Sequence, residues 1–280
     1  MDVAERIRAR GAELTTAERR VAAAILDSPQ AVGFGTVADL ARKAEVGAAS
    51  VVRLANKLGF DGYSELQQSI RDELSAQLRP AAERIRDEMN GSVAAHAESE
   101  LSNVRTTLGG LSDEVLTAVI ARLTDLERPV LVVSGDASNG VARQFIGQLG
   151  QLRPGVTLVE GSEVAVRGAI AVADPGSTAL IVDLRRYERW VLEAHRLLIE
   201  RGVWTVGITD SVLSPVAQCA EVTILVSAGA IGPFDSHVGT LSVLNLITTS
   251  VAAGLRASAV DRLGAIESAW TAAGSLTDSA

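Results

Sequence analysis

Apolar residues in the first eighty positions recur every three or four residues between short polar turns, a spacing that predicts amphipathic helices. Thr15 and Glu18 form a capping box before the first helix, in which each side chain bonds the other residue's backbone N–H. Thr36 with Asp39 opens the second helix, and Ser64 with Gln67 caps the fourth. Ser28-Pro29 ends the first helix, because proline cannot continue one. The expected helices are Ala17–Leu26, Val37–Ala44, one within Val46–Gly59, and Glu65–Leu78.

Only the glycine-containing turn Glu45–Gly47 separates the second and third helices, which is typical of a helix-turn-helix. Val51, Leu54, Ala55 and Leu58 share one apolar side of the third helix. The opposite side is small and polar, and it carries cations but no acid. Such a side suits the major groove of DNA, since small residues allow close approach while Arg, Asn and Lys meet base edges and phosphates. The alternative is a small helical bundle without a ligand.

Seven side chains on and near this helix are candidate DNA contacts, in three roles. The candidates are Arg53 and Asn56 for the bases, Ala49 and Ser50 for the floor of the groove, and Thr36, Lys57 and Tyr63 for the phosphates. The partner that these roles require is a double-stranded operator.

From Pro129 the pattern changes to short, nearly all-apolar runs that alternate with helical segments. Strands buried on both faces form a parallel sheet with helices on both sides. The expected fold class is an all-α helix-turn-helix domain followed by an α/β domain with a five-stranded parallel sheet in flavodoxin-like layers. The expected strands are Val130–Val133, Val156–Val159, Ala179–Asp183, Val203–Ile208 and Val222–Val226, and the expected helices are Val141–Leu152, Glu163–Val172, Tyr187–Arg201, Pro215–Cys219 and Val238–Leu255.

Four segments follow from these patterns. They are the helix-turn-helix domain over residues 1–79, a mostly helical connector over 80–127, the α/β domain over 128–256, and a C-terminal helix and tail over 257–280. Ligands of parallel sheets bind beyond the carboxyl ends of the strands. The first such loop, Ser134–Gly140, places glycine and hydroxyls at a helix N-terminus, which is either a phosphate cradle or a tight turn.

Composition narrows the classes of function. The 280 residues are 47% hydrophobic and 21% charged, as in soluble proteins, and an aromatic share of 3% disfavours stacking platforms for single-stranded nucleic acid. Residues 1–79 contain 11 Lys and Arg and 11 Asp and Glu, so the net charge of −8 belongs to the remainder. One cysteine, Cys219, and three scattered histidines give no disulfide, metal or cofactor pattern. Without a signal peptide or membrane span, a cytoplasmic protein is expected.

Two groups of residues resemble a known family. Leu14–Val21, Thr36–Ala41 and Ser50–Leu66 resemble the N-terminal domain of RpiR-type transcriptional regulators. Ser134–Ser138 and Gly202–Ala217 resemble the first phosphosugar loop and a strand with its turn in the sugar isomerase (SIS) domain. The resemblance implies a bacterial DNA-binding regulator that forms a homodimer or tetramer and senses a phosphosugar or related anion.

The chain departs from the family where a second, hydroxyl-rich phosphate loop is usual, because Asp183–Arg189 stands there. Arg185 or Arg186 could bind an anion bidentately. Equally, Asp183 could pair with one of these arginines and close the site. The candidate effector contacts are Gly135, Ala137, Ser138, Asp183, Arg185, Arg186 and Ser236.

Two other functions fit parts of the sequence. An SIS-type isomerase or lyase needs a general acid and base, for which His237 is a better candidate than the mid-helix His195, while Glu160 and Glu163 flank the second loop. These residues form no convergent pair in the sequence, so no catalytic residue is assigned. A regulator whose second domain only dimerises is the remaining alternative.

Overall fold

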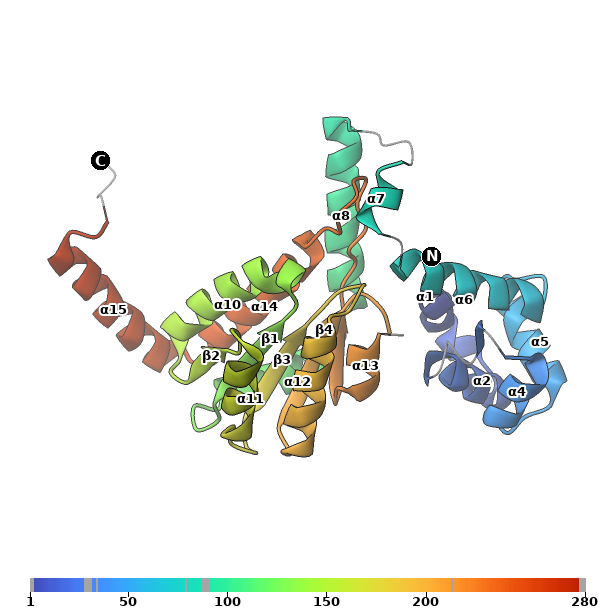
Figure 1. Cartoon of the computed structure of the whole chain (residues 1–280), viewed down its shortest axis with the longest axis horizontal. Coiled ribbons are helices and arrows are strands. Elements are labelled where there is room, and N and C mark those ends of the chain that lie inside the picture. Colours follow the sequence, from blue (N-terminus) through green and yellow to red (C-terminus); the bar gives the residue numbers. More distant parts are fainter. Residues whose placement is uncertain are drawn as a thin grey trace. The chain divides into compact units, whose positions relative to one another are not determined.

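A computed structural model describes residues 3–27, 32–33, 35–78, 80–86, 91–212 and 214–276 (Figure 1). The chain divides into two compact units, Met1–Arg84 and Ile85–Ala280. The predicted helix stop at Ser28-Pro29 lies outside the described residues.

Unit 1 is helical, as the apolar spacing predicts. Its elements are α1 (Val3–Ala9), η1 (Gly11–Glu13), α2 (Thr16–Asp27), α4 (Val37–Lys43), α5 (Ala48–Lys57), α6 (Tyr63–Leu78) and α7 (Ala81–Arg84). The predicted starts of α2 and α4 are confirmed, and each has a capping box. The predicted cap at Ser64 is wrong, because α6 already begins at Tyr63. The core joins residues from α2, α4, α5 and α6, among them Val21, Leu40, Leu54 and Leu66.

The turn between α4 and α5 has the short form of a helix-turn-helix. Glu45 takes the left-handed conformation with φ of 52°, and Gly47 caps α5 in an extended conformation without a side-chain bond. Apolar side chains of both helices face inward, including Leu40 and Ala41 from α4 and Val51 from α5. The two helices and their turn therefore have the form of a helix-turn-helix.

Unit 2 is built on a five-stranded sheet, and the predicted fold class is confirmed. The strands are β1 (Val130–Ser134), β2 (Val156–Leu158), β3 (Thr178–Val182), β4 (Trp204–Thr209) and β5 (Val222–Leu225). All neighbours run parallel, in the order β2-β1-β3-β4-β5. Every residue of β1 and β3 is buried, as expected for strands covered on both faces.

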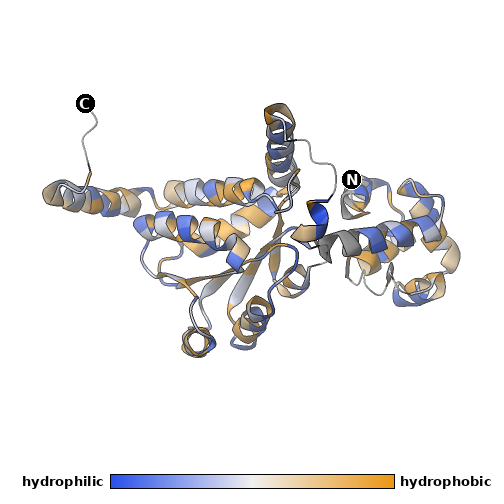
Figure 2. Ribbon diagram, turned by 45° about the horizontal axis from the view of Figure 1, so that its top comes forward, coloured by the Kyte–Doolittle hydropathy of each residue, from blue (hydrophilic) through white to orange (hydrophobic). Residues whose placement is uncertain are grey.

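Helices cover both faces of this sheet (Figure 1). One face packs against α9 (Asp113–Thr124), α10 (Asn139–Leu152) and α14 (Val238–Gly254). The other packs against α11 (Glu163–Ala171), α12 (Arg189–Glu200) and α13 (Pro215–Cys219). Hydrophobic and hydrophilic residues are mixed along most helices of the chain, as in amphipathic helices that cover a core (Figure 2).

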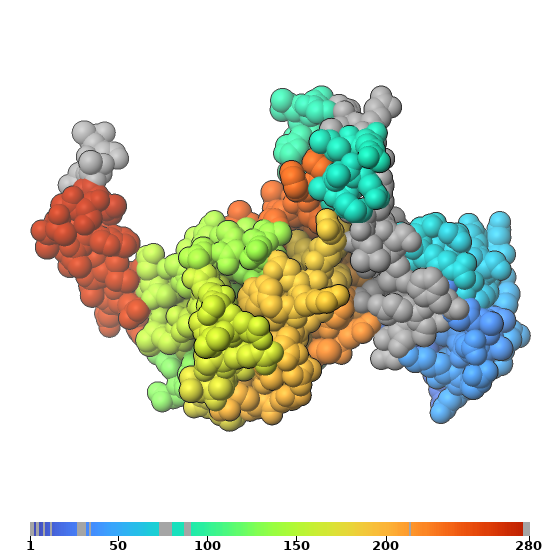
Figure 3. Space-filling model, in the orientation of Figure 1, coloured from blue at the N-terminus to red at the C-terminus, as the bar shows by residue number. Residues whose placement is uncertain are grey.

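Two further helices complete unit 2. α8 (Val93–Gly110) packs along α14, and its buried Asn103 donates a hydrogen bond of 2.7 Å to the carbonyl of Gly229. The segment predicted as a connector thus contributes α8 and α9 to this unit. α15 (Arg256–Ala273) extends from the sheet body, as the space-filling view shows (Figure 3). No single helix among the described residues is long and apolar enough to cross a membrane, although α14 and α15 pass that test as a pair bent by 104°.

Candidate DNA-reading helix and effector site

One side of α5 is exposed and forms the candidate reading face, defined by Ala48, Ala49, Val52, Arg53 and Asn56. This face carries small side chains, a guanidinium and an amide, and no acid. Val52, 38% exposed, was not among the predicted contacts, although an apolar side chain here suits the methyl group of thymine. Arg53, Asn56 and Ala49 lie on this exposed face, and their contacts with bases stay a prediction.

Ser50 requires a correction. We predicted it at the floor of the groove, but it is only 7% exposed. Its Oγ accepts a hydrogen bond of 2.7 Å from Nη2 of Arg53, one turn later on the same helix. Ser50 therefore orients the arginine, and does not itself face outward.

Lys57, a predicted phosphate contact, is bonded within unit 1. Its Nζ donates to the carbonyl of Glu13 at 2.6 Å and to the carboxylate of Glu18 at 3.0 Å. The pKa of Glu18 is lowered, first by the backbone N–H of Thr15 and then by Lys57. The ammonium thus joins the end of α5 to the start of α2, which is a structural role.

Thr36 and Tyr63 are likewise engaged within the unit, where we predicted contacts with phosphates. The Thr36 hydroxyl donates to Asp39 at 2.7 Å and accepts from its backbone N–H at 3.2 Å. The Tyr63 hydroxyl lies 3.2 Å from the carbonyl of Val32 and 3.4 Å from that of Gly35, and burial raises its pKa. Both side chains hold the segment that leads into α4.

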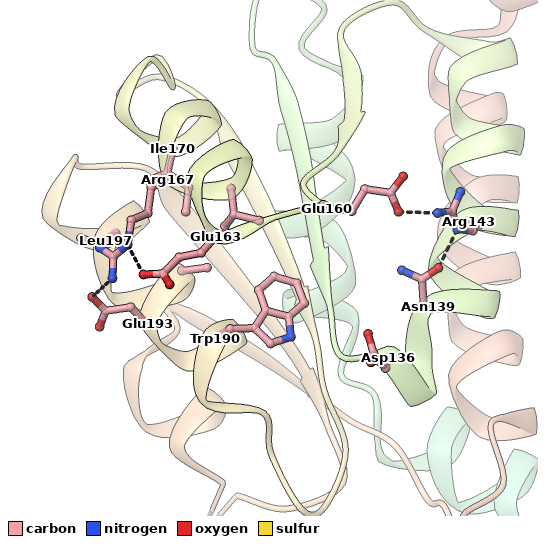
Figure 4. A pocket seen from close by; sticks show the side chains of 13 residues that line it. Asp136, Asn139, Arg143, Glu160, Glu163, Arg167, Ile170, Trp190, Glu193 and Leu197 are labelled. Atoms are coloured by element: carbon pink, nitrogen blue, oxygen red, sulfur yellow. Dashed lines mark hydrogen bonds and ion pairs between the residues drawn. The ribbon is translucent and has the colours of Figure 1, made fainter.

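In unit 2 the strand order reverses between β1 and β3, the place where this type of sheet binds ligands. A cavity of about 440 Å³ lies beside it, between the loop after β1 and helices α10, α11 and α12 (Figure 4). It is lined by Asp136, Asn139, Arg143, Glu160, Gly161, Glu163, Val166, Arg167, Ile170, Trp190, Glu193, Ala194 and Leu197. None of the seven predicted effector contacts lines this cavity.

The charges of the cavity are mostly paired. Arg143 bonds Glu160 at 2.5 Å, and Arg167 pairs with Glu163 at 2.8 Å and with Glu193 at 3.6 Å. Figure 4 shows the Trp190 ring between these two groups. Four carboxylates and two guanidinium groups line the space, so its formal charge is negative.

The first predicted loop lies at the mouth of this site. Ala137 is exposed, whereas the Ser138 hydroxyl is buried and has no hydrogen-bond partner among the described residues. The backbone N–H of Asp136 donates to Oε1 of Glu188 at 2.5 Å. A Cβ added at Gly135 would lie 2.5 Å from Oδ1 of Asp183, so only glycine fits against that carboxylate.

Asp183 does not pair with an arginine, contrary to one alternative above. It is buried at the end of β3, and its Oδ2 accepts a hydrogen bond of 2.8 Å from the backbone N–H of Glu188. Burial, with smaller contributions from the charges of Glu188 and Asp210, raises its pKa to about 7.

Arg185 pairs with carboxylates other than Asp183. Its Nε lies 3.1 Å from Asp235 and 3.4 Å from Asp210, and its Nη2 donates to the carbonyl of Ala228 at 3.2 Å. Arg186 is exposed and takes a left-handed conformation with φ of 67°. An effector anion would have to compete with two aspartates for Arg185.

Ser236, a predicted effector contact, is bonded within unit 2. Its hydroxyl donates a bond of 2.5 Å to Glu100 of α8, and accepts one of 3.2 Å from the backbone N–H of Val238 at the start of α14. It therefore joins α8 to α14.

The histidines do not form a catalytic pair with the carboxylates considered for that role. His195 is buried beside Thr205, with 3.1 Å between Nε2 and Oγ1, and burial lowers its pKa to about 4. His237 is half-buried at the start of α14, and burial lowers its pKa as well. Glu160 and Glu163 are paired with the arginines of the cavity.

Sequence reasoning missed two residues that organise the candidate effector site, Glu188 and Trp190. Glu188 bonds the first loop through one carboxylate oxygen, and its Oε2 accepts a hydrogen bond of 2.6 Å from Nε1 of Trp190. Glu188 lies in Asp183–Arg189, the segment that departs from the family pattern, and this departure is the sequence feature that could have drawn attention to it. Its partner in the first loop, Asp136, is 52 residues away in the chain and could not be inferred.

Comparison with protein families accounts for both units. Residues 1–77 match the family described as helix-turn-helix domain, rpiR family, and residues 127–250 match the SIS domain. The chain combines an RpiR-family helix-turn-helix domain with an SIS domain. This RpiR-type chain is 26% identical over 255 residues to the HTH-type transcriptional regulator HexR of Pseudomonas aeruginosa, covering 88% of each chain. It has the organisation of an HTH-type transcriptional regulator, with a helix-turn-helix domain followed by an SIS domain.

Two solved structures share its fold. The sugar isomerase domain of an RpiR transcription factor from Sphaerobacter thermophilus is 26% identical, with a TM-score of 0.57 over 62% of this chain and 97% of that one. The Vibrio vulnificus NanR protein, solved in complex with ManNAc-6P, is 20% identical, with a TM-score of 0.57 over 96% of this chain and 98% of that one. The second similarity supports the fold alone.

Proposed function

We propose that α5 reads the major groove of an operator through Arg53 and Asn56, with Ala49 and Val52 close to the bases. The observation that carries this proposal is the exposed, acid-free face of α5, on which Ser50 orients the Arg53 guanidinium. Guanidinium and amide groups make bidentate contacts with guanine and adenine. Since helix-turn-helix proteins commonly bind DNA as twofold dimers, we propose a homodimer on two half-sites.

Unit 2 binds a small-molecule effector at the carboxyl edge of β1 and β3, where the cavity opens beside the loop after β1. The position at the switch point of the sheet, together with a mixed lining of Trp190, arginines and carboxylates, supports this assignment. NanR was solved with ManNAc-6P, so sugar phosphates are the first class to test. Binding shifts the operator affinity of the protein by the coupling typical of such regulators, about 1–3 kcal/mol.

A catalytic function has less support. Isomerisation of a phosphosugar requires an acid and a base that face the ligand. Three of the four carboxylates of the cavity, Glu160, Glu163 and Glu193, are paired with Arg143 or Arg167, and His195 is buried in the core. We therefore propose a sensor that does not turn its ligand over. Turnover of a sugar phosphate by the purified protein would contradict this assignment.

Selection from a random pool of double-stranded DNA with the purified full chain tests the proposal. We expect enrichment of one motif with two related halves, as a dimer requires. A thermal-shift screen of sugar phosphates, amino sugars and organic acids then identifies the effector, since a ligand of the folded state raises Tm. Addition of that effector is expected to change the affinity for the selected DNA by about fivefold or more. Failure to enrich any motif would overturn the DNA-reading role.

A further inference from the structure

A carboxylate of the chain itself is bound at the loop after β1. The backbone N–H of Asp136 donates to Oε1 of Glu188 at 2.5 Å, and Trp190 donates to its Oε2 at 2.6 Å. The backbone N–H of Glu188 is in turn held by Asp183 at 2.8 Å. A Cβ added at Gly135 would lie 2.9 Å from Oε1 of Glu188, so the carboxylate closes directly over the loop.

This loop has the properties of an anion site. It leads into α10, a helix of 14 residues, whose dipole and free N–H groups attract negative charge. Ser138 lies in the same loop, where its hydroxyl is 1% exposed and has no partner among the described residues. The site therefore offers donors to an anion, and Glu188 supplies one from within the chain.

Other carboxylates around the loop disfavour the binding of a second anion while Glu188 is in place. Asp183 is buried next to Gly135, and Asp136 adds an exposed carboxylate in the loop itself. A phosphoryl group carries up to two negative charges and would meet Glu188 at hydrogen-bonding distance, where like charges repel. It reaches the N–H of Asp136 only after the Glu188 side chain has moved away.

We propose that Glu188 is an internal occupant of the anion subsite, and that it sets the specificity of this domain against phosphorylated ligands. A phosphorylated effector binds only by displacing the Glu188 carboxylate, whereas a ligand without a phosphoryl group has no such competitor. This inference rests on the proposed role of unit 2 as an effector sensor.

The displacement has a spectroscopic signature. Trp190 lines the cavity and loses the acceptor for its indole N–H when Glu188 leaves. Its fluorescence is therefore expected to change on binding of phosphate, and Trp190→Phe is expected to remove that change.

Calorimetric titration of the full chain with inorganic phosphate and with glucose 6-phosphate tests the proposal. Glu188→Gln, which keeps the shape of the side chain without its charge, is expected to bind both at least tenfold more tightly than the wild type. The matched control is Glu200→Gln, which removes an exposed carboxylate from the same helix outside the cavity and is expected to change the affinity less than threefold. Equal affinity in wild type and Glu188→Gln, or an equal gain in Glu200→Gln, would overturn the inference.

Two further measurements keep the outcome interpretable. If Glu188→Gln does not fold, Glu188→Asp retains the charge on a shorter side chain that reaches the loop less well, and a gain in phosphate affinity is still expected. Titration of the selected operator with and without each compound that raises Tm in the thermal-shift screen separates the two proposals. A gain in phosphate affinity in Glu188→Gln, with none of those compounds changing DNA binding, would leave the role of Glu188 intact and contradict the sensor function.

Discussion

Nη2 of Arg53 lies 2.7 Å from Oγ of Ser50, so the one arginine on the exposed face of α5 is held by a hydroxyl from the buried edge of the same helix. A long side chain that is already oriented loses less conformational freedom when it binds. The bond therefore prepares Arg53 for contact with a base.

Ser50→Ala is expected to weaken operator binding by about 0.5–1.5 kcal/mol, because Arg53 loses the hydrogen bond that orients it. The thermal stability of unit 1 is expected to change little. Ser50→Thr keeps the hydroxyl and is expected to retain the affinity. Fluorescence anisotropy with the selected operator measures both, and equal losses in the two variants would contradict a positioning role for the hydroxyl.

Lys57→Met is expected to lower the free energy of unfolding by about 1–2 kcal/mol, because the ammonium bonds Glu13 and the buried Glu18. Urea denaturation measures the change. Arg20→Met is the control, since the exposed pair with Glu45 at 3.9 Å contributes about 0–1 kcal/mol. A large loss of operator affinity at unchanged stability would instead restore the phosphate-contact role for Lys57.

Gly135→Ala is expected to destabilise the protein by about 1–3 kcal/mol, because the new methyl group overlaps the carboxylates of Asp183 and Glu188. Gly140→Ala is the matched control in the following helix, where a Cβ meets no atom within 4 Å. It is expected to stabilise by about 0.5–1 kcal/mol through helix propensity. Similar denaturation midpoints for the two variants would show that the loop is not closed by these carboxylates.

Asp183→Asn is expected to change the pH dependence of stability. The folded-state pKa of Asp183 is raised to about 7 from an ordinary value of 3.8, so the folded state holds a proton that the unfolded state loses between these values. The wild type therefore loses stability as pH rises through this window, and the variant does not. We expect Asp183→Asn to be more stable by about 1–3 kcal/mol at pH 8.

Urea denaturation at pH 5 and pH 8 compares the wild type with this variant. Asp136→Asn serves as its control, since that carboxylate is exposed on the neighbouring loop. Parallel pH profiles for the wild type and Asp183→Asn would contradict the raised pKa.

The hydrophobic pattern predicted the helices because each buries one side in a core. It predicted the strands because the core strands are buried on both faces. The start of α12 was less well predicted. Tyr187 reads as helical, yet its hydroxyl donates to Asp210 at 2.9 Å and Glu188 becomes the N-cap, so the helix begins at Arg189. Such a long-range bond leaves no trace in the local pattern.

The candidate sites were predicted less well than the fold, for the same reason. The spacing of α5 identified Arg53 and Asn56 on one face, since that depends only on helix geometry. Whether Lys57 is free depends on Glu18, 39 residues earlier. Whether Arg185 is free depends on Asp235, 50 residues later in the chain. Residue type indicates what a polar side chain can bind, and tertiary structure decides what it does bind.

Anisotropy titration of the selected operator is the most direct test of whether α5 reads DNA through Arg53. Wild type, Arg53→Ala and the control Arg105→Ala, an exposed arginine of α8, are titrated on the operator and on unrelated DNA. We expect Arg53→Ala to lose about 1–3 kcal/mol on the operator and little on unrelated DNA, while Arg105→Ala keeps its preference. Unchanged operator affinity in Arg53→Ala would contradict the account.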